Sequence, residues 1–346
     1  MKQTKRSMLF GSAVATLLAG NLVSAAALPT MVPTPADNPT TSEKVELGKQ
    51  LFFDPRLSID GTVSCNSCHN VMSSGTDNRP TSVGINGQRG GRNAPTVWNA
   101  AFLSAQFWDG RAASLEDQSK GPPLNPIEMG MPSEAAVVER LSSIPGYVEQ
   151  FNAIFKGKNA VSYDNMAKAI AAFERTLVTR NSPYDRYVSG DKTALSQQAQ
   201  RGKQVFEQSG CNACHSGTNF AGPALPTGQG FYQKFPSNSS GYDKKYDLLA
   251  DKGRFEATKD EADMNMWRVP SLRNIALTAP YFHNGSVKTL DEAVRVMAKA
   301  QLNLDISDKD AADVVAFLNS LSGEFPEISM PRLPDTVNNS LVGSIK

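Results

Sequence analysis

Two short cysteine motifs carry the clearest chemistry in this chain. They are Cys65-Asn66-Ser67-Cys68-His69 and Cys211-Asn212-Ala213-Cys214-His215. The spacing Cys-x-x-Cys-His is typical of c-type haem attachment, in which both thiols bond the haem and the histidine becomes an axial iron ligand. A zinc site would gather four ligands in one place, and a redox Cys-x-x-Cys site would not require the histidine. Because the motifs use all four cysteines and two of the three histidines, we interpret them as two haem c sites.

The small number of histidines limits how the two irons can be ligated. His283 is the only histidine outside the motifs, so two bis-histidine haems are excluded. An electron-carrying haem needs a sixth ligand, whereas a catalytic haem needs an exchangeable position. Met297 is the strongest methionine candidate, with Met264 and Met266 as alternatives. On the residues alone, a methionine that fills the core is the simpler interpretation of each.

The first 25 residues have the pattern of a secretory signal peptide. A positive region (Lys2, Lys5 and Arg6) precedes an apolar stretch from Met8 to about Leu22 and a small-residue cleavage site at Val23-Ser24-Ala25. An uncleaved N-terminal anchor is the alternative. Cleavage would change the net charge from +1 to −2, which argues against nucleic acid or an anionic membrane as the main partner. We expect a periplasmic protein with no membrane span in its mature form.

The chain repeats one pattern around each haem motif. Leu47-Gly48-Lys49-Gln50-Leu51-Phe52 precedes the first motif, and Arg201-Gly202-Lys203-Gln204-Val205-Phe206 precedes the second. After the motifs, Pro95, Asn99, Phe107, Asp109, Gly110 and Leu115 align without a gap on Pro270, Asn274, Phe282, Asn284, Gly285 and Leu290. Trp108 then falls opposite His283. Self-similarity of this length indicates two copies of one haem-binding unit.

Helices must position both motifs. Apolar residues recur at helical spacing over 134–155, 161–178 and 194–208. Thr289 with Glu292 forms a capping box that opens a helix to about Ala300, and Ser307 with Asp310 opens a terminal helix. Residues 217–262 are rich in Gly, Ser, Asp and Lys, and we expect them to wrap the second haem as a loop.

The expected fold class is mainly α, with two cytochrome-c-like haem domains in tandem and long loops. We place the signal peptide at 1–25 and the N-terminal haem domain at 26–179. The segment Arg180–Lys192, rich in turn residues, is the predicted linker. The C-terminal haem domain covers 193–323. An irregular tail covers 324–346, and we expect it to pack back on the first domain.

Several longer motifs extend this pattern. They are Asn93-Ala94-Pro95-Thr96-Val97, Phe107-Trp108-Asp109-Gly110-Arg111, Gln118, Glu128-Met129-Gly130, Phe173-Glu174-Arg175-Thr176-Leu177, Leu272-Arg273-Asn274 and Tyr281-Phe282-His283. Together they resemble the bacterial dihaem cytochrome c peroxidase family, which also contains the methylamine-utilisation dihaem enzymes that oxidise a precursor protein. The resemblance runs from about Val45 to Gly323, which is nearly the whole predicted mature chain.

The resemblance implies that the first haem is the peroxidatic one. His69 would be its proximal ligand, Glu128 the catalytic carboxylate and Gln118 a distal-pocket amide. One positioned carboxyl can remove a proton from peroxide and return it to the leaving oxygen. Trp108 would pass electrons between the haems. On the residues alone, Glu128 would be a solvated surface residue and Trp108 a core aromatic.

The resemblance also assigns the second haem. Met297 stands fourteen residues after His283, where the family's high-potential haem takes its methionine; the protein-oxidising relatives have tyrosine there. A thioether ligand raises haem potential, so a haem held by His215 and Met297 would store electrons at high potential. His283 would be structural or an electron relay. The resemblance further implies a homodimer and an interdomain calcium site formed by Asn93, Thr278 and Pro280.

One position departs from the family. Many members keep the peroxidatic haem closed with a distal histidine sixteen residues after the proximal one, and reduction of the other haem releases it. Here that position is Ile85, which cannot bind iron. Met72 is a substitute ligand supported only by its proximity. We therefore predict that the first haem is five-coordinate or water-bound in every redox state.

These features predict a periplasmic dihaem cytochrome c peroxidase. It would reduce hydrogen peroxide to water with electrons from a small cytochrome c or a cupredoxin. Its cofactors would be two covalently bound haem c groups and Ca²⁺. The alternative is a dihaem oxidase that modifies another protein through high-valent haem iron. A plain electron carrier is a third interpretation, but it requires two six-coordinate irons, which the histidine count makes difficult.

Overall fold

The computed structural model describes residues 26–337 and residue 340, so the predicted signal peptide lies outside the described residues. Helices dominate this part of the chain, and the two strands within it form one small sheet, which confirms the mainly α prediction. Over the same residues, we find no helix with the length and apolar character needed to cross a membrane.

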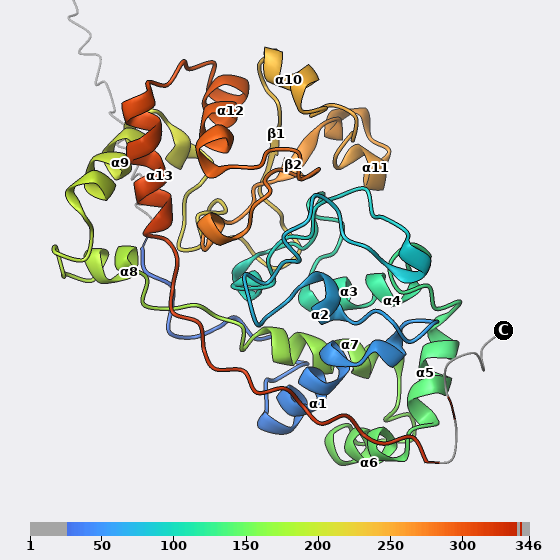
Figure 1. Ribbon diagram of the computed structural model, residues 1–346. Coiled ribbons are helices and arrows are strands. Elements are labelled where there is room, and N and C mark those ends of the chain that lie inside the picture. The colour runs from blue at the N-terminus through green and yellow to red at the C-terminus, as the bar shows by residue number, and fades with distance from the viewer. Residues whose placement is uncertain (1–25, 338–339, 341–346) are drawn as a thin grey trace, which may run out of the picture.

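The helices of the two halves form separate groups (Figure 1). The first group is α1 (Ser42–Phe53), α2 (Cys65–Cys68), α3 (Leu115–Ser119), α4 (Gly121–Leu124), α5 (Glu134–Ser142), α6 (Pro145–Ile154) and α7 (Tyr163–Glu174). After α8 (Pro183–Val188), the second group is α9 (Gln197–Gln208), α10 (Gly241–Lys245), α11 (Phe255–Thr258), α12 (Leu290–Leu302) and α13 (Asp308–Asn319). Strands β1 (Tyr232–Lys234) and β2 (Met266–Arg268) pair antiparallel in the second half.

Each half is built on one pair of packed helices, α1 with α7 and α9 with α13. Phe52 meets Phe173 with ring centroids 5.3 Å apart, and Phe206 meets Phe317 at the same separation. Such aromatic pairs stabilise a core beyond the area they bury. The repeated Leu-Gly-Lys-Gln and Arg-Gly-Lys-Gln segments lie in α1 and α9, so the internal repeat is a repeat of structure.

A glycine in the first helix of each pair allows this close packing. A methyl group at Gly48 would overlap the carbonyl oxygen of Ala169, and one at Gly202 would overlap that of Asp313. Replacing Gly48 by alanine is expected to destabilise the holoprotein by about 1–3 kcal/mol, because overpacking forces the helices apart. Thermal unfolding checks this. Gly241→Ala is the matched control, because Gly241 lies in α10 and a methyl group there meets no atom within 4 Å; equal losses would contradict the argument.

Most predicted helices form near their predicted bounds, but the segment 134–155 is two helices rather than one. α5 ends at Ser142, and Pro145 occupies the first turn of α6. Proline has no N–H to continue the hydrogen-bond ladder of a preceding helix, so it starts a new helix instead. Both predicted N-caps form: the Glu292 N–H donates to the Thr289 hydroxyl, and the Asp310 N–H donates to the Ser307 hydroxyl. The reciprocal half of the capping box predicted at Thr289 is wrong, because the Glu292 carboxylate accepts from Lys245 and Tyr246 instead.

The predicted linker is more ordered than its composition suggests. It contains α8, which Ser182 and Asp185 open with a capping box. Asp185 forms a buried ion pair with Arg273 at 2.8 Å, so this segment is anchored to the second half. Residues 217–262 are mostly loop as expected, but they also contain β1, α10 and α11.

Both ends of the described chain cross to the other half. The tail packs on the first half as predicted: Phe325 meets Trp98 edge-on with centroids 4.9 Å apart, and the Arg56 guanidinium donates to the Pro334 carbonyl at 2.9 Å. In Figure 1 the red tail runs from α13 past α1 to α6. At the other end, Arg273 donates to the carbonyl of Ala26 at 3.3 Å, although the sequence assigned this residue to the first domain.

Candidate active site

The residues predicted for the first haem line one cavity, except Cys65, which packs against the hydrophobic core of the first half. Cys68 and His69 come from the first motif, Gln118 from α3, and Glu128 from the loop between α4 and α5. Trp108, in the loop before α3, lines the same cavity. Residues that are far apart in the sequence are therefore brought to one cavity, which is also lined by part of a haem-attachment motif.

His69 is arranged to present one ring nitrogen to a metal. The short helix α2, opened by a capping box between Ser64 and Ser67, holds the motif in a tight turn. The Nδ1 of His69 lies 2.9 Å from the carbonyl oxygen of Pro95, so Nδ1 carries the proton and donates it. Burial lowers the pKa of His69 against the effect of this hydrogen bond. The ring is therefore neutral, with the Nε2 lone pair free to bind iron.

Glu128 is a partly buried carboxyl held by a tight turn. Its N–H donates to the Asn125 carbonyl at 3.1 Å, and the Asn125 side-chain amide donates to Glu128 Oε1 at 2.8 Å. Burial raises the pKa of Glu128, against the lowering effects of Arg111 and of the Asn125 hydrogen bond. A carboxyl whose pKa is raised toward neutrality is suited to accept a proton and return it.

Ile85 belongs to the hydrophobic core of the first half. Its side chain is 4% exposed and joins a cluster with Met129, and a methyl group at Gly130 would meet its Cδ1 atom. Its N–H donates to the carbonyl of Glu128 at 3.0 Å. Met72 is 58% exposed. Among the described residues that line the first cavity, His69 is the only histidine and there is no methionine.

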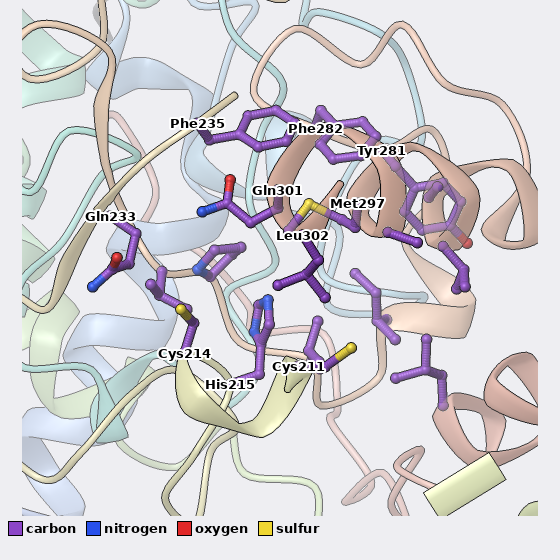
Figure 2. Close-up of a pocket in the computed structure, with 18 of the residues that line it drawn as sticks. Cys211, Cys214, His215, Gln233, Phe235, Tyr281, Phe282, Met297, Gln301 and Leu302 are labelled. Carbon is purple, nitrogen blue, oxygen red and sulfur yellow. The ribbon is translucent and has the colours of Figure 1, made fainter. Parts of the chain in front are cut away.

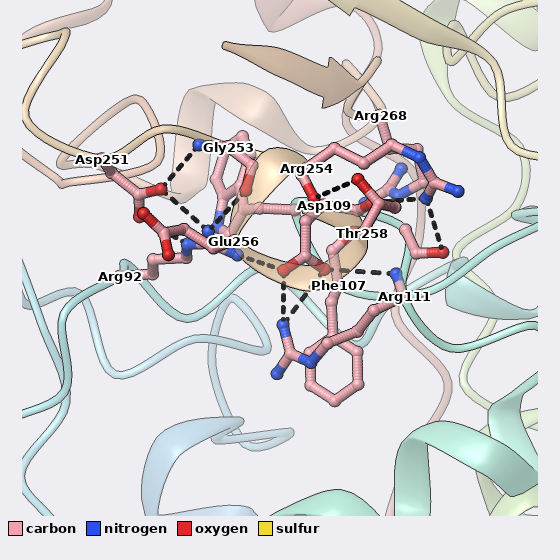
Figure 3. Close-up of polar contacts among 12 residues, drawn as sticks. Arg92, Phe107, Asp109, Arg111, Asp251, Gly253, Arg254, Glu256, Thr258 and Arg268 are labelled. Atoms are coloured by element: carbon pink, nitrogen blue, oxygen red, sulfur yellow. Dashed lines mark hydrogen bonds and ion pairs between the residues drawn. The ribbon is translucent and has the colours of Figure 1, made fainter. Parts of the chain in front are cut away.

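Charged side chains from both halves meet beside the first cavity (Figure 3). Arg92 forms ion pairs with Asp109 and with Asp251, each at 2.6 Å, and Asp109 also binds Arg111 at 3.0 Å. Asp251 and Glu256, from the second half, line the first cavity. Arg92, Asp251 and Glu256 were not predicted from the sequence. Of this network, the motifs identified in the sequence contain only Asp109 and Arg111.

The second cavity is mainly apolar and contains the second motif. Cys211, Cys214 and His215 line it together with Met297 of α12. Figure 2 shows the Met297 sulfur and the His215 ring on opposite sides of the cavity, facing one another. The Nδ1 of His215 donates to the carbonyl of Phe220 at 3.1 Å, which leaves Nε2 for a metal. Neither of the alternative methionines, Met264 and Met266, is among the residues that line this cavity.

Trp108 forms a wall that the two cavities share. Its indole N–H donates to the carbonyl of Asn93 at 2.8 Å, and the N–H of Asn93 donates to the carbonyl of His283 at 2.7 Å. His283 lines the second cavity and stacks on Trp267, with ring centroids 4.1 Å apart and ring planes 17° apart. Aromatic side chains therefore occupy the region between the two motifs.

The two cavities fit haem groups better than zinc. Cys68 lines the first cavity and Cys211 and Cys214 line the second, whereas one zinc ion would gather its cysteines in one place. Burial raises the pKa of the thiols, that of Cys211 to about 11, whereas zinc binds thiolates. The buried Nε2 of His283 has no hydrogen-bond partner among the described residues, and burial lowers the pKa of this ring to about 4. A haem propionate would supply the missing partner.

The residues predicted for calcium lie along the seam between the halves. The Asn93 amide donates to the Arg79 carbonyl at 2.8 Å. The adjacent Asn78 donates to the carbonyls of Leu277 and Ala279, which flank Thr278. Amide and carbonyl oxygens are the hard donors that Ca²⁺ prefers. The residues present are thus of a suitable kind, and the hydrogen bonds of Asn78 connect the two halves beside them.

Comparisons with known proteins agree with this geometry. Residues 42–193 match the family model described as di-haem cytochrome c peroxidase, and residues 199–322 match the cytochrome c model. A cytochrome c551 peroxidase of Pseudomonas aeruginosa is 48% identical over 89% of this chain and 86% of its own length. One of Nitrosomonas europaea is 43% identical over 98% of both.

Methylamine utilization proteins are also similar to this chain. The methylamine utilization protein MauG of Methylorubrum extorquens is 36% identical over 88% of this chain and 86% of its own length. Among solved structures, a MauG-like protein associated with microbial copper homeostasis matches with a TM-score of 0.75 and 31% identity. It covers 86% of this chain and 95% of that one.

Proposed function

The chain belongs to the di-haem cytochrome c peroxidase family and is a haem peroxidase with two covalently bound haem c groups; from this premise we propose that its substrate is hydrogen peroxide, reduced to water at the first cavity. One observation carries the proposal. His69, the neutral histidine of the first motif, shares a cavity with the Glu128 carboxyl, whose pKa is raised, and with the Gln118 amide.

Glu128 is the proposed acid–base group. The haem held by Cys65, Cys68 and His69 supplies the iron and the electrons that the reduction of peroxide needs. In its ionised form, Glu128 accepts a proton from peroxide and then returns it to the oxygen that leaves as water. The hydrogen bond from Asn125 orients the carboxyl, and the amide of Gln118 is a donor that can hold the substrate.

This role predicts a pH dependence. Because the ionised form of Glu128 must receive the first proton, kcat/KM is expected to fall as the pH decreases through the raised pKa of this carboxyl. The acid limb of the profile should therefore lie above the pKa of an ordinary glutamate, about 4.3. Steady-state rates measured across the acidic range test this. A profile that stays level below the ordinary pKa would contradict the assignment.

Electrons enter at the second haem in this proposal. His215 and Met297, which line one cavity, would hold its iron, and the thioether would give this haem a high potential. Trp108, which lines both cavities, is the proposed connection to the first haem. The donor is a small cytochrome c or a cupredoxin, and the compartment is the periplasm. Calcium bound by Asn93, Thr278 and Pro280 joins the halves, and the active form is a homodimer.

We further propose that the first haem is open in every redox state. The histidine that closes this haem in many relatives is replaced by Ile85, whose side chain is buried in the core. The exposed Met72 would have to leave the surface to replace it. Reductive activation is then unnecessary.

Hydrogen peroxide reduction by a reduced small cytochrome c tests the proposed function. Rapid, peroxide-dependent oxidation of the donor supports a peroxidase. The alternative, oxidation of another protein, predicts slow turnover with this donor but peroxide-dependent cross-linking or modification of a partner protein. Met297 favours the peroxidase, because the protein-oxidising relatives have tyrosine at that position.

A further inference from the structure

The internal repeat reveals one chemical difference between the two haem cavities. The helices α7 and α13 are equivalent over their length: Gly48 approaches Ala169 and Phe173 as Gly202 approaches Asp313 and Phe317. The match continues beyond the helices. The Asn99 N–H donates to the carbonyl of Leu177, and the Asn274 N–H donates to that of Leu321. This register pairs residue 174 with residue 318.

Residue 174 is a glutamate, whereas residue 318 is a leucine. Glu174 lines the first cavity and Leu318 lines the second, and each is 5% exposed. The Oε2 atom of Glu174 is buried and has no hydrogen-bond partner among the described residues. The first cavity thus contains a carboxyl at a position where the equivalent residue of the second cavity is aliphatic.

We propose that Glu174 is a proton-holding residue that couples the redox state of the first haem, and not of the second, to pH. When one electron reaches the first iron, Glu174 takes up one proton from solvent. When the electron leaves, Glu174 releases that proton, so charge beside the buried iron stays balanced. The electron comes from the second haem or from an added reductant. The inference requires haem binding only, so it stands or falls independently of the substrate.

The surroundings of Glu174 support this role. Burial raises its pKa to about 8, while Arg175 lowers it and Glu116 raises it. Arg175 is paired with Glu116 of α3 at 2.7 Å. Lys44 of α1 donates to Asn38 at 2.9 Å, and Arg140 of α5 is bound to backbone carbonyls. Cys65 becomes an uncharged thioether when haem is attached. Nε and Nη1 of Arg175 have no hydrogen-bond partner among the described residues, so Arg175 and Glu116 act on the pKa of Glu174 with opposite signs. Neither forms a hydrogen bond with the buried Oε2 atom, and the charge of the nearby iron would add to this balance.

The sign of the coupling follows from charge. Reduction removes one positive charge from the iron, which raises the pKa of a neighbouring acid. Between the pKa values in the two redox states, the potential of the first haem falls as pH rises. Each pH unit there changes its reduction equilibrium constant by up to about tenfold, because one proton accompanies each electron.

Spectroelectrochemical titration of the holoprotein across the neutral and mildly alkaline range tests the proposal. The wild type should show this slope at the first haem, and Glu174→Gln and Glu174→Leu should both abolish it. The second haem is the internal control, with a potential that Glu174 substitutions leave unchanged. A slope that persists in the variants, as haem propionates would give, or a flat wild-type profile would overturn it.

A second measurement needs no variant. A redox-difference infrared spectrum of the wild type should contain the band of a carboxyl that gains a proton on reduction of the first haem and loses it on oxidation. Absence of that band would overturn the proposal even if both variants failed to incorporate haem.

Discussion

Replacing Glu128 by glutamine is expected to lower kcat for peroxide reduction by about two to four orders of magnitude, the usual contribution of a positioned acid–base group. The amide preserves the shape of the side chain and its contact with Asn125, but it cannot accept the proton of peroxide. Stopped-flow mixing of the holoenzyme with peroxide measures the loss directly. The residual rate should also lack the acid limb that the wild type shows.

Glu256→Gln is the matched control. Glu256 lines the same cavity from the second half, so its substitution alters the charge of the cavity without touching the proposed proton carrier. We expect less than a few-fold change in kcat, with unchanged haem spectra in both variants. If both substitutions lowered kcat to the same extent, the charge of the cavity rather than a specific proton transfer would explain the activity.

Replacing Met297 by leucine is expected to lower the potential of the second haem by tenths of a volt, since axial ligands tune haem potentials over about 0.8 V. Leucine keeps the volume and apolar character of the side chain but has no sulfur to bind iron. The second haem would then no longer accept electrons from its donor, and turnover with a reduced small cytochrome c should fall at least about tenfold. Potentiometric titration and steady-state assay measure the two effects.

Met266→Leu is the control for this substitution. Met266 lies in β2, and it is not among the residues that line the second cavity. Its replacement should leave the potential of the second haem unchanged. A normal potential in Met297→Leu together with a lowered one in Met266→Leu would move the ligand assignment to the strand.

Local pattern was sufficient to predict the scaffold of this protein. The haem motifs, the matched blocks around them and the caps at Thr289 and Ser307 depend on spacing along the chain, and each is found where the sequence placed it. The break before α6 was also visible in principle, because Pro145 cannot continue a helix. The capping box of α8 is also visible in the sequence, but the turn-forming residues of the segment 180–192 favoured the prediction of a linker.

Long-range pairing could not be predicted in this way. Arg92 and Asp251 are 159 positions apart, and nothing in either local segment identifies the other as a partner. The same applies to Arg273, which forms an ion pair with Asp185. The role proposed for Glu174 depends on its place in the first cavity and on the comparison of α7 with α13, which only the structure provides. Glu128 became a site residue through resemblance, and the structure adds the cavity, the Asn125 contact and the burial that give it a chemical role.

The most direct test of an open peroxidatic haem is the first turnover with hydrogen peroxide. Fully ferric holoprotein is mixed with peroxide and a reduced small cytochrome c, and the experiment is repeated after one haem has been reduced. We predict immediate turnover at the same rate from both starting states, because Ile85 cannot close the first haem. A lag in the ferric sample that pre-reduction abolishes would show that another ligand closes it, and would contradict this account.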